Sequence, residues 1–235
     1  AAVATPHAQH ATGIVRCPQG NIGDRPDYVL MWGWGVMNQT AVQEAANVRY
    51  PMDRFIGVWW SGAEPDVLPA GAGAHGYKSA NFTGVGTDYP IFADIKSYVV
   101  DRGKAAGDGT SIGTVQYNRG LYAAMLAAEA ARTAQEIHGV AQITAVMMRD
   151  GMEALRVDAE RMAEIGMPGF GPEVNVTCEN HGGPGVGLIQ QWDANAKVWN
   201  AVTDFIYSDR EVIDPLIEED SMAYAAENNI ATRCD

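Results

Sequence analysis

The feature that most constrains the fold is a regular alternation between short apolar runs and helical segments, which begins at Asp27. Residues 27–35 form an apolar run that ends in glycines, and residues 38–49 place alanine and valine at helical spacing. The pattern repeats with an apolar run at 55–60, a short helix at 64–70 and a third strand-like run at 76–82. Strands that alternate with helices predict an α/β fold, in which helices flank a parallel sheet.

The second half of the chain continues with longer elements. The spacing of apolar residues predicts helices at 89–100, 117–138 and 150–165, with Pro90 in the first turn and Gly139 at an end. Residues 186–205 alternate apolar and polar side chains around a turn at 193–196, which predicts a β-hairpin. The acidic tail at 209–229 is expected to be helical after Pro215.

Composition excludes some functions. The 235 residues include 16 Lys and Arg against 29 Asp and Glu, a net charge of −13, which argues against nucleic-acid binding. No uncharged stretch is apolar enough for a membrane span. Three cysteines without a C-x-x-C pair imply that any disulfide is long-range and that one thiol is left over. Residues 1–23 contain no acidic residue, so they form an atypical segment without the features of a signal peptide.

Two motifs have ordinary interpretations. Residues 71–76 match G-x-G-x-x-G, but no strand precedes them and a strand-like run follows, so we interpret them as a connection between elements. Cys178 and His181, like His7 and His10, are closely spaced, but no second pair completes a zinc site. The sequence therefore predicts no metal and no cofactor.

The tryptophan pairs Trp32/Trp34 and Trp59/Trp60 follow the first two predicted strands, where open parallel sheets bind ligands. Side-chain alternation would point Trp59 and Trp60 in opposite directions, one into the core and one into a pocket. The alternative is that all four cover the sheet as core residues. Trp32, Trp192 and Trp199 are expected to be structural.

The sequence resembles the periplasmic type 1 substrate-binding proteins of ABC transporters, the group that includes branched-chain amino-acid, aromatic-acid and amide receptors. The resemblance runs through PDYVLMWGWGVMNQTAVQEAANVRYPMDRFIGVWW, GAGAHGYKSANF, YPIFADIKSYVVDRGK, GTVQYNRGLYAAMLAAEAAR and LIQQWDANAKVWNAVTDFIYSDREVIDPLIEED. It extends from about Asp24 to the C-terminus, and its specificity lies in the order and spacing of these segments.

This resemblance implies a two-lobed receptor that closes over a small ligand without a cofactor. The family position of Trp59 normally holds an acid that grips an ammonium group, so tryptophan there favours an aromatic or apolar ligand. A cleft arginine would bind a ligand carboxylate. The ligand-binding residues implied are Trp34, Trp59 and Tyr117, with Asn38, Trp60, Asn118 and Arg119 as secondary candidates.

The resemblance also implies an incomplete architecture, because the family has a first lobe and half of a second before the matching part. The expected parts are an atypical segment at 1–23, a partial second lobe at 24–83, a returning segment of the first lobe at 84–175, and a C-terminal hairpin and helical tail at 176–235. The expected setting is the periplasm, with a membrane permease as partner and weak or no ligand binding by the chain alone. Exposed sheet edges would favour oligomers or pairing with another chain. The alternative function is an esterase or amidase with His75 or His181 as base.

Overall fold

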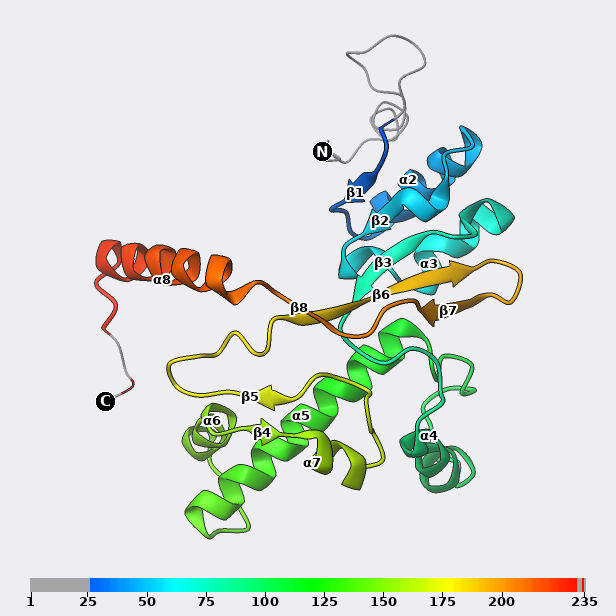
Figure 1. Cartoon of the computed structure of the whole chain (residues 1–235). Helices are drawn as coiled ribbons and strands as arrows, with labels where there is room; N and C mark the ends of the chain where they lie inside the picture. The colour runs from blue at the N-terminus through cyan, green and yellow to red at the C-terminus, as the bar shows by residue number, and fades with distance from the viewer. Residues whose placement is uncertain (1–25, 232–233, 235) are drawn as a thin grey trace.

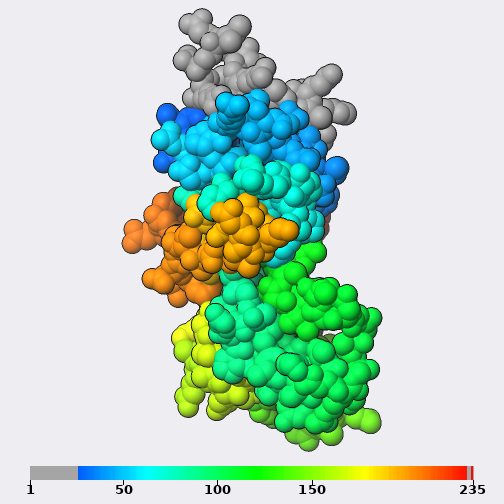
Figure 2. Space-filling view, turned by 90° about the vertical axis from the view of Figure 1, so that its right-hand side faces the viewer, coloured from blue at the N-terminus to red at the C-terminus, as the bar shows by residue number. Residues whose placement is uncertain are grey.

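The computed structural model describes residues 26–231 and Cys234, which form two regions stacked end to end (Figures 1 and 2). The sheet region comprises residues 26–82 and 186–208, and the helical region comprises residues 83–185. The chain passes from the first region to the second after β3 and returns before β6, and the last helix extends away from both (Figure 1).

The sheet region is built on six strands in the order β1-β2-β3-β6-β7, with β8 paired to β6. The strands β1 (Val29–Met31), β2 (Phe55–Gly57) and β3 (Lys78–Asn81) are parallel, as the alternation predicts. The strands β6 (Val186–Asp193), β7 (Val198–Ala201) and β8 (Ile206–Tyr207) join antiparallel. The predicted hairpin is confirmed, and the sheet as a whole is mixed rather than purely parallel.

Short helices connect the parallel strands. Gly35, with a φ of 58°, turns the chain from β1 into α2 (Val36–Asn47), a conformation that favours glycine. The turn η1 (Met52–Arg54) precedes β2, whereas η2 (Trp59–Ser61), α3 (Glu64–Val67) and η3 (Leu68–Ala74) link β2 to β3. The G-x-G-x-x-G motif lies in η3 and the turn after it, which confirms its interpretation as a connection.

The core of the sheet region is closed by the hairpin. Tyr77 packs edge-on against Phe55, and Trp199 lies between Tyr77 and Trp192, with ring centroids 6.1 and 5.3 Å away. The side chains of Trp192 and Trp199 are buried, so these two tryptophans are structural as expected. Buried Gln190 binds the Gly62 carbonyl at 2.7 Å, which ties the hairpin to the parallel strands.

The helical region is organised around the long helix α5 (Val115–His138), which Thr114 caps and which ends at the left-handed Gly139. It packs against α6 (Ala145–Glu153), where the absence of a side chain at Gly151 lets that helix approach Ala130 and Ala134. The helix α4 (Pro90–Ile95) contacts α5 through Phe92 and Tyr117, and α7 (Ala159–Glu164) contacts it through Arg161 and Glu129. The π-turn η4 (Lys96–Val100) follows α4 directly. The strands β4 (Arg156–Val157) and β5 (Val174–Asn175) pair antiparallel.

Two predicted boundaries are wrong. The expected helix at 150–165 is two helices, α6 and α7, with β4 between them, because Thr144 and Asp158 each cap a separate N-terminus. The last helix, α8 (Arg210–Glu227), begins before Pro215 rather than after it. The helices at 89–100 and 117–138 are confirmed, the first as α4 followed by η4.

None of the helices within the described residues is both long and apolar enough to cross a bilayer.

Candidate functional site

An aromatic row lies where β2 and β3 end beside the helical region. The Trp34 ring is 5.7 Å from the Trp60 ring, Trp60 is 4.7 Å from Trp59, and Trp59 is 5.5 Å from Phe82, measured between centroids. We call these four residues the aromatic row. Its tryptophans are exposed or half-exposed, so they form a surface that an aromatic or apolar group can contact.

Arg119 connects the helical region to this row. Its guanidinium carbon lies 5.2 Å from the centroid of Trp59 and 5.6 Å from that of Phe82, within cation–π range. One terminal nitrogen donates a hydrogen bond to the Trp59 carbonyl oxygen. The arginine is carried by the first turns of α5, so the start of this helix fixes a cation against two rings of the sheet region.

Two carboxylates lie close to Arg119. Glu64 accepts hydrogen bonds from the Val115 amide at 3.3 Å, where its charge suits the N-terminus of α5. Buried Asp66 accepts from the Ala63 amide at 2.9 Å. Burial raises the pKa of both carboxyl groups and lowers that of Arg119, and the two carboxylates partly oppose the lowering.

Two buried asparagines donate hydrogen bonds to backbone carbonyl groups in this part of the structure. The Asn38 amide nitrogen donates hydrogen bonds to the Trp60 carbonyl at 2.8 Å and to Asp66 Oδ1 at 3.1 Å. Because both partners are acceptors, they fix which side of the Asn38 amide group carries the nitrogen. The Asn118 nitrogen donates to the Gly84 and Gly86 carbonyls at 2.9 Å each, in the segment that joins the regions. Both side chains therefore hold backbone in place.

Three of the predicted residues each carry a buried polar atom without a hydrogen-bond partner. Within the described residues, five buried side-chain atoms lack a hydrogen-bond partner, and three of them are Asn38 Oδ1, Asn118 Oδ1 and Arg119 Nε. Buried polar groups almost always have partners, and an orphaned group costs about 1–3 kcal/mol. All three belong to residues that the resemblance implies for ligand binding.

The structure joins five of the seven predicted residues by direct contacts: Trp34, Trp59 and Trp60 through their rings, Asn38 through the Trp60 carbonyl, and Arg119 through Trp59. Asn118 instead binds the carbonyl groups of Gly84 and Gly86. Tyr117 differs, because its ring packs against Phe92 in the helical region with centroids 6.4 Å apart. Trp59 and Trp60 do not point in opposite directions as expected: they are 38% and 39% exposed, because η2 replaces the predicted strand end. Trp32, expected to be structural, is exposed at the end of β1.

Sequence reasoning missed Phe82, Glu64 and Asp66 as members of this site. Phe82 ends the third strand-like run, as the tryptophans end the first two, so its position was an available signal. The acids flank Pro65 directly after the second tryptophan pair. The sequence gives no signal for these two acids, because they come close to Arg119 only when α5 packs beside them.

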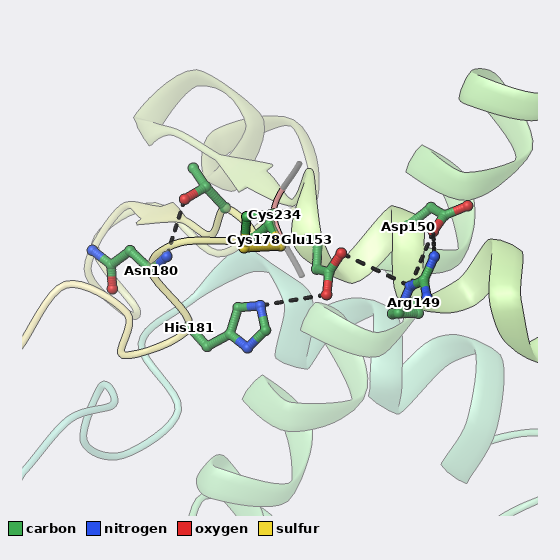
Figure 3. The surroundings of a disulfide bond; sticks show 8 residues. Arg149, Asp150, Glu153, Cys178, Asn180, His181 and Cys234 are labelled. Carbon is green, nitrogen blue, oxygen red and sulfur yellow. Dashed lines mark hydrogen bonds and ion pairs between the residues drawn. A yellow bond between two sulfur atoms is a disulfide. The ribbon is translucent and has the colours of Figure 1, made fainter. Parts of the chain in front are cut away.

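The cysteines form one long-range bridge, Cys178 to Cys234, across 56 residues, as the sequence predicted for any disulfide. Cys17, His7, His10 and the predicted segment at 1–23 lie outside the described residues. Figure 3 shows His181 pointing toward Glu153, to which its Nε2 lies 3.5 Å away. In the described part of the chain, no group of three or more His, Cys, Asp or Glu side chains could hold a metal ion.

The two histidines considered as hydrolytic bases each contact an acid on the surface. His75 Nδ1 lies 3.5 Å from Asp193 Oδ1 and accepts from the Ala194 amide at 3.3 Å. His181 contacts Glu153 as described above. A base of this kind needs a nucleophile within hydrogen-bond reach, and these contacts orient the rings without supplying one.

Comparison with known proteins identifies the architecture. A crystal structure described as an ABC transporter permease from the Pseudomonas fluorescens group matches with a TM-score of 0.89 and 35% identity, over 99% of this chain and 55% of its own. A branched-chain amino-acid ABC transporter protein from Thermus thermophilus with bound valine matches with a TM-score of 0.60 and 23% identity, over 80% of this chain and 48% of its own.

A solute-binding protein of an ABC transporter from Rhodopseudomonas palustris, in complex with p-hydroxybenzoic acid, has a TM-score of 0.54 and 14% identity, over 83% of this chain and 49% of its own. The resemblance to ABC transporter substrate-binding proteins is confirmed. The periplasmic-binding-protein-like fold is confirmed as well, and the chain spans about half the length of these relatives. No protein-family model and no curated protein matches the sequence.

The neighbours are proteins of transport systems rather than enzymes. Within this architecture the aromatic row lies at the junction of the two regions, which is the place where the resemblance implies a ligand. The predicted boundary at 83 falls where the chain leaves the sheet region after β3, whereas the chain returns at 185–186, beyond the predicted boundary at 175. The boundary at 23 lies outside the described residues, and the assignment of the parts to lobes stays a prediction.

Proposed function

We propose that this chain is part of a solute-binding protein of an ABC transporter and that it supplies one wall of the ligand site. The observation that carries the proposal is the aromatic row with Arg119 held over Trp59 and Phe82, at the junction of the two regions. The exposed rings would contact the apolar part of a ligand, and Arg119 would supply a positive charge beside them.

The ligand that fits is a small carboxylate with an aromatic or branched apolar body. Its ring or side chain would stack on Trp34, Trp59 or Trp60, and its carboxylate would pair with Arg119. Neighbours with bound valine and p-hydroxybenzoic acid support this class. The partner would be a membrane permease, and the setting the periplasm, as the resemblance implies.

The charges on this side of the proposed site do not by themselves favour an anionic ligand. Glu64 and Asp66 contribute negative charge beside Arg119, so an anionic ligand needs further donors from polypeptide on the other side of the site. We therefore expect the chain alone to bind benzoate or valine only at millimolar concentration, which isothermal titration can measure. Micromolar binding to a monomer would show that the wall is sufficient by itself.

A matched pair of ligands tests the role assigned to Arg119. Tryptophan fluorescence, titrated to millimolar ligand, should report tighter binding of benzoate than of benzyl alcohol, because only benzoate carries a carboxylate. Arg119→Met should remove this preference, whereas Arg156→Met, an exposed arginine on β4, should keep it. Equal binding of the two compounds by the unaltered chain would refute a carboxylate ligand.

A further inference from the structure

The helical region has a concave site of its own next to the aromatic row. It is a hollow of about 940 Å³, bounded by α5, α6, β5 and the loop at 181–185. Phe82 borders both places, since it lines the hollow and its ring centroid is 5.5 Å from that of Trp59. Pockets that bind small molecules measure about 300–1,000 Å³, so the hollow has the size of a ligand site.

One face of each of two neighbouring helices lines the hollow. On α5 the lining residues recur at the spacing of one helix face, and three of the four are alanines: Ala123, Leu126, Ala127 and Ala130. On α6 the same spacing gives Ala145, Met148, Arg149 and Met152. The alanines leave space unfilled, and methionine side chains are flexible enough to adapt to an occupant. Leu155, Val174 and Val176 add further apolar wall.

The charged side chains at the rim of the hollow contact partners within the protein (Figure 3). Arg149 Nη2 lies 2.6 Å from Asp150 Oδ1, and Arg149 Nε lies 3.8 Å from Glu153 Oε2. The other oxygen of Glu153 lies 3.5 Å from His181 Nε2. A charged ligand would have to compete with these pairs, and the net charge of −13 further disfavours an anion. The hollow therefore suits an uncharged apolar molecule.

We propose that the hollow is a second ligand site, which binds an uncharged apolar small molecule such as a medium-chain alcohol or ester. The apolar body contacts Ala127 on α5, Met148 and Met152 on α6 and Val174 on β5, where its burial removes apolar surface from water on both sides. A hydroxyl or ester group stays at the rim, in contact with water. The inference does not depend on the aromatic row, for which the proposed ligand is a carboxylate.

An uncharged fluorescent probe tests the proposal on the whole chain. N-phenyl-1-naphthylamine emits more strongly in apolar surroundings, and it should bind one equivalent per chain with a dissociation constant in the micromolar range. 1-Decanol should displace the probe at concentrations at least tenfold lower than decanoate, because only decanoate brings a charge to the paired rim. Benzoate, the ligand class proposed for the aromatic row, should leave the probe bound even at millimolar concentration.

Neighbouring alanines on α5 provide matched variants. Ala123 and Ala127 line the hollow, whereas Ala124 and Ala128 lie on the same helix, are likewise exposed and do not line it. Ala123→Glu and Ala127→Glu should each weaken probe binding at least tenfold, because the bound probe would strip water from the new carboxylate. Ala124→Glu and Ala128→Glu add the same charge to the same helix and should bind the probe as the unaltered chain does.

The melting temperatures of the four variants should agree within a few degrees, so that a difference in binding reports the site rather than the fold. Three results would overturn the proposal: no saturable probe binding by the unaltered chain, equal binding by all four variants, or equal displacement by decanol and decanoate. Displacement by benzoate would also overturn it, because the probe would then report the aromatic row. Failure of the proposed carboxylate site would appear separately, as equal binding of benzoate and benzyl alcohol.

Discussion

The sheet region and the helical region differ in how completely each buries its core. In the sheet region Trp192, Trp199 and Tyr77 fill the space beneath the strands, and the buried amide of Gln190 finds partners on both of its polar atoms. In the helical region Phe170 is fully buried, yet the other side of α5 borders an open hollow of about 940 Å³. A single chain can thus hold one core that is closed and one that is open.

The largest expected effect tests the closed core. Trp192→Ala should lower the free energy of unfolding by about 3–5 kcal/mol, because it removes a large aromatic side chain that is 2% exposed. Guanidinium denaturation followed by circular dichroism measures the change. Trp32→Ala, where the side chain is 67% exposed, should stay within about 0.5 kcal/mol. Similar losses in both variants would contradict the assignment of Trp192 to the core.

The disulfide should have the next largest effect. Cys178→Ser opens a loop of 56 residues, and such a bridge typically contributes about 2–4 kcal/mol. Because α8 buries no residue of its own, hydrogen exchange should accelerate in α8 and in the loop at 179–185 while β1–β3 stay protected. Cys234→Ser should have the same effect, and the double variant should add nothing. Faster exchange throughout the sheet would contradict the expectation that loss of the disulfide affects only α8 and the loop at 179–185.

An ion pair within the helical region should contribute less. Glu129 on α5 is buried and binds Arg161 on α7 at 2.7 Å and Arg132 at 3.0 Å. Hydrogen bonds from Arg161, followed by those from Arg132, hold the pKa of Glu129 below its usual 4.5. Glu129→Gln should therefore cost about 1–3 kcal/mol at pH 7.

The sign of the pH dependence follows from that lowered pKa. The stabilisation by Glu129 is present above about pH 4.5 and is lost as the pH falls through the lower folded-state value. Denaturation curves of the two proteins should consequently converge below that range. A constant difference from pH 7 to pH 3 would show that the ionised form is not what stabilises the pairing of α5 with α7.

The smallest effect concerns the junction of the two regions. Arg119→Lys keeps the charge but loses the planar stack on Trp59 and Phe82, so we expect about 0.5–1 kcal/mol of destabilisation. Thermal melting with tryptophan fluorescence should detect the changed surroundings of Trp59. An unchanged fluorescence spectrum would indicate that the arginine does not contact the row in solution.

The sequence predicted the strands and helices of the sheet region well, because apolar periodicity there matches burial on one sheet face. It failed at 150–165, where caps at Thr144 and Asp158 divide one apparent helix into α6 and α7. The sequence also did not predict that the sheet is mixed. The sheet becomes mixed because the hairpin pairs with β3, and this pairing connects residues more than 100 positions apart. Local patterns carry no information on such pairings.

For the site, the position of the tryptophans after β1 and β2 was readable from the sequence, and Arg119 and the asparagines came from the family resemblance. Their grouping was decided by tertiary structure, because η2 turns Trp59 and Trp60 to the same surface and α5 carries Arg119 across 60 residues to meet them. The sequence by itself determined which elements form, since periodicity and caps act locally. Only folding decided which core is closed and which polar atoms are left unpaired, because both depend on contacts between distant segments.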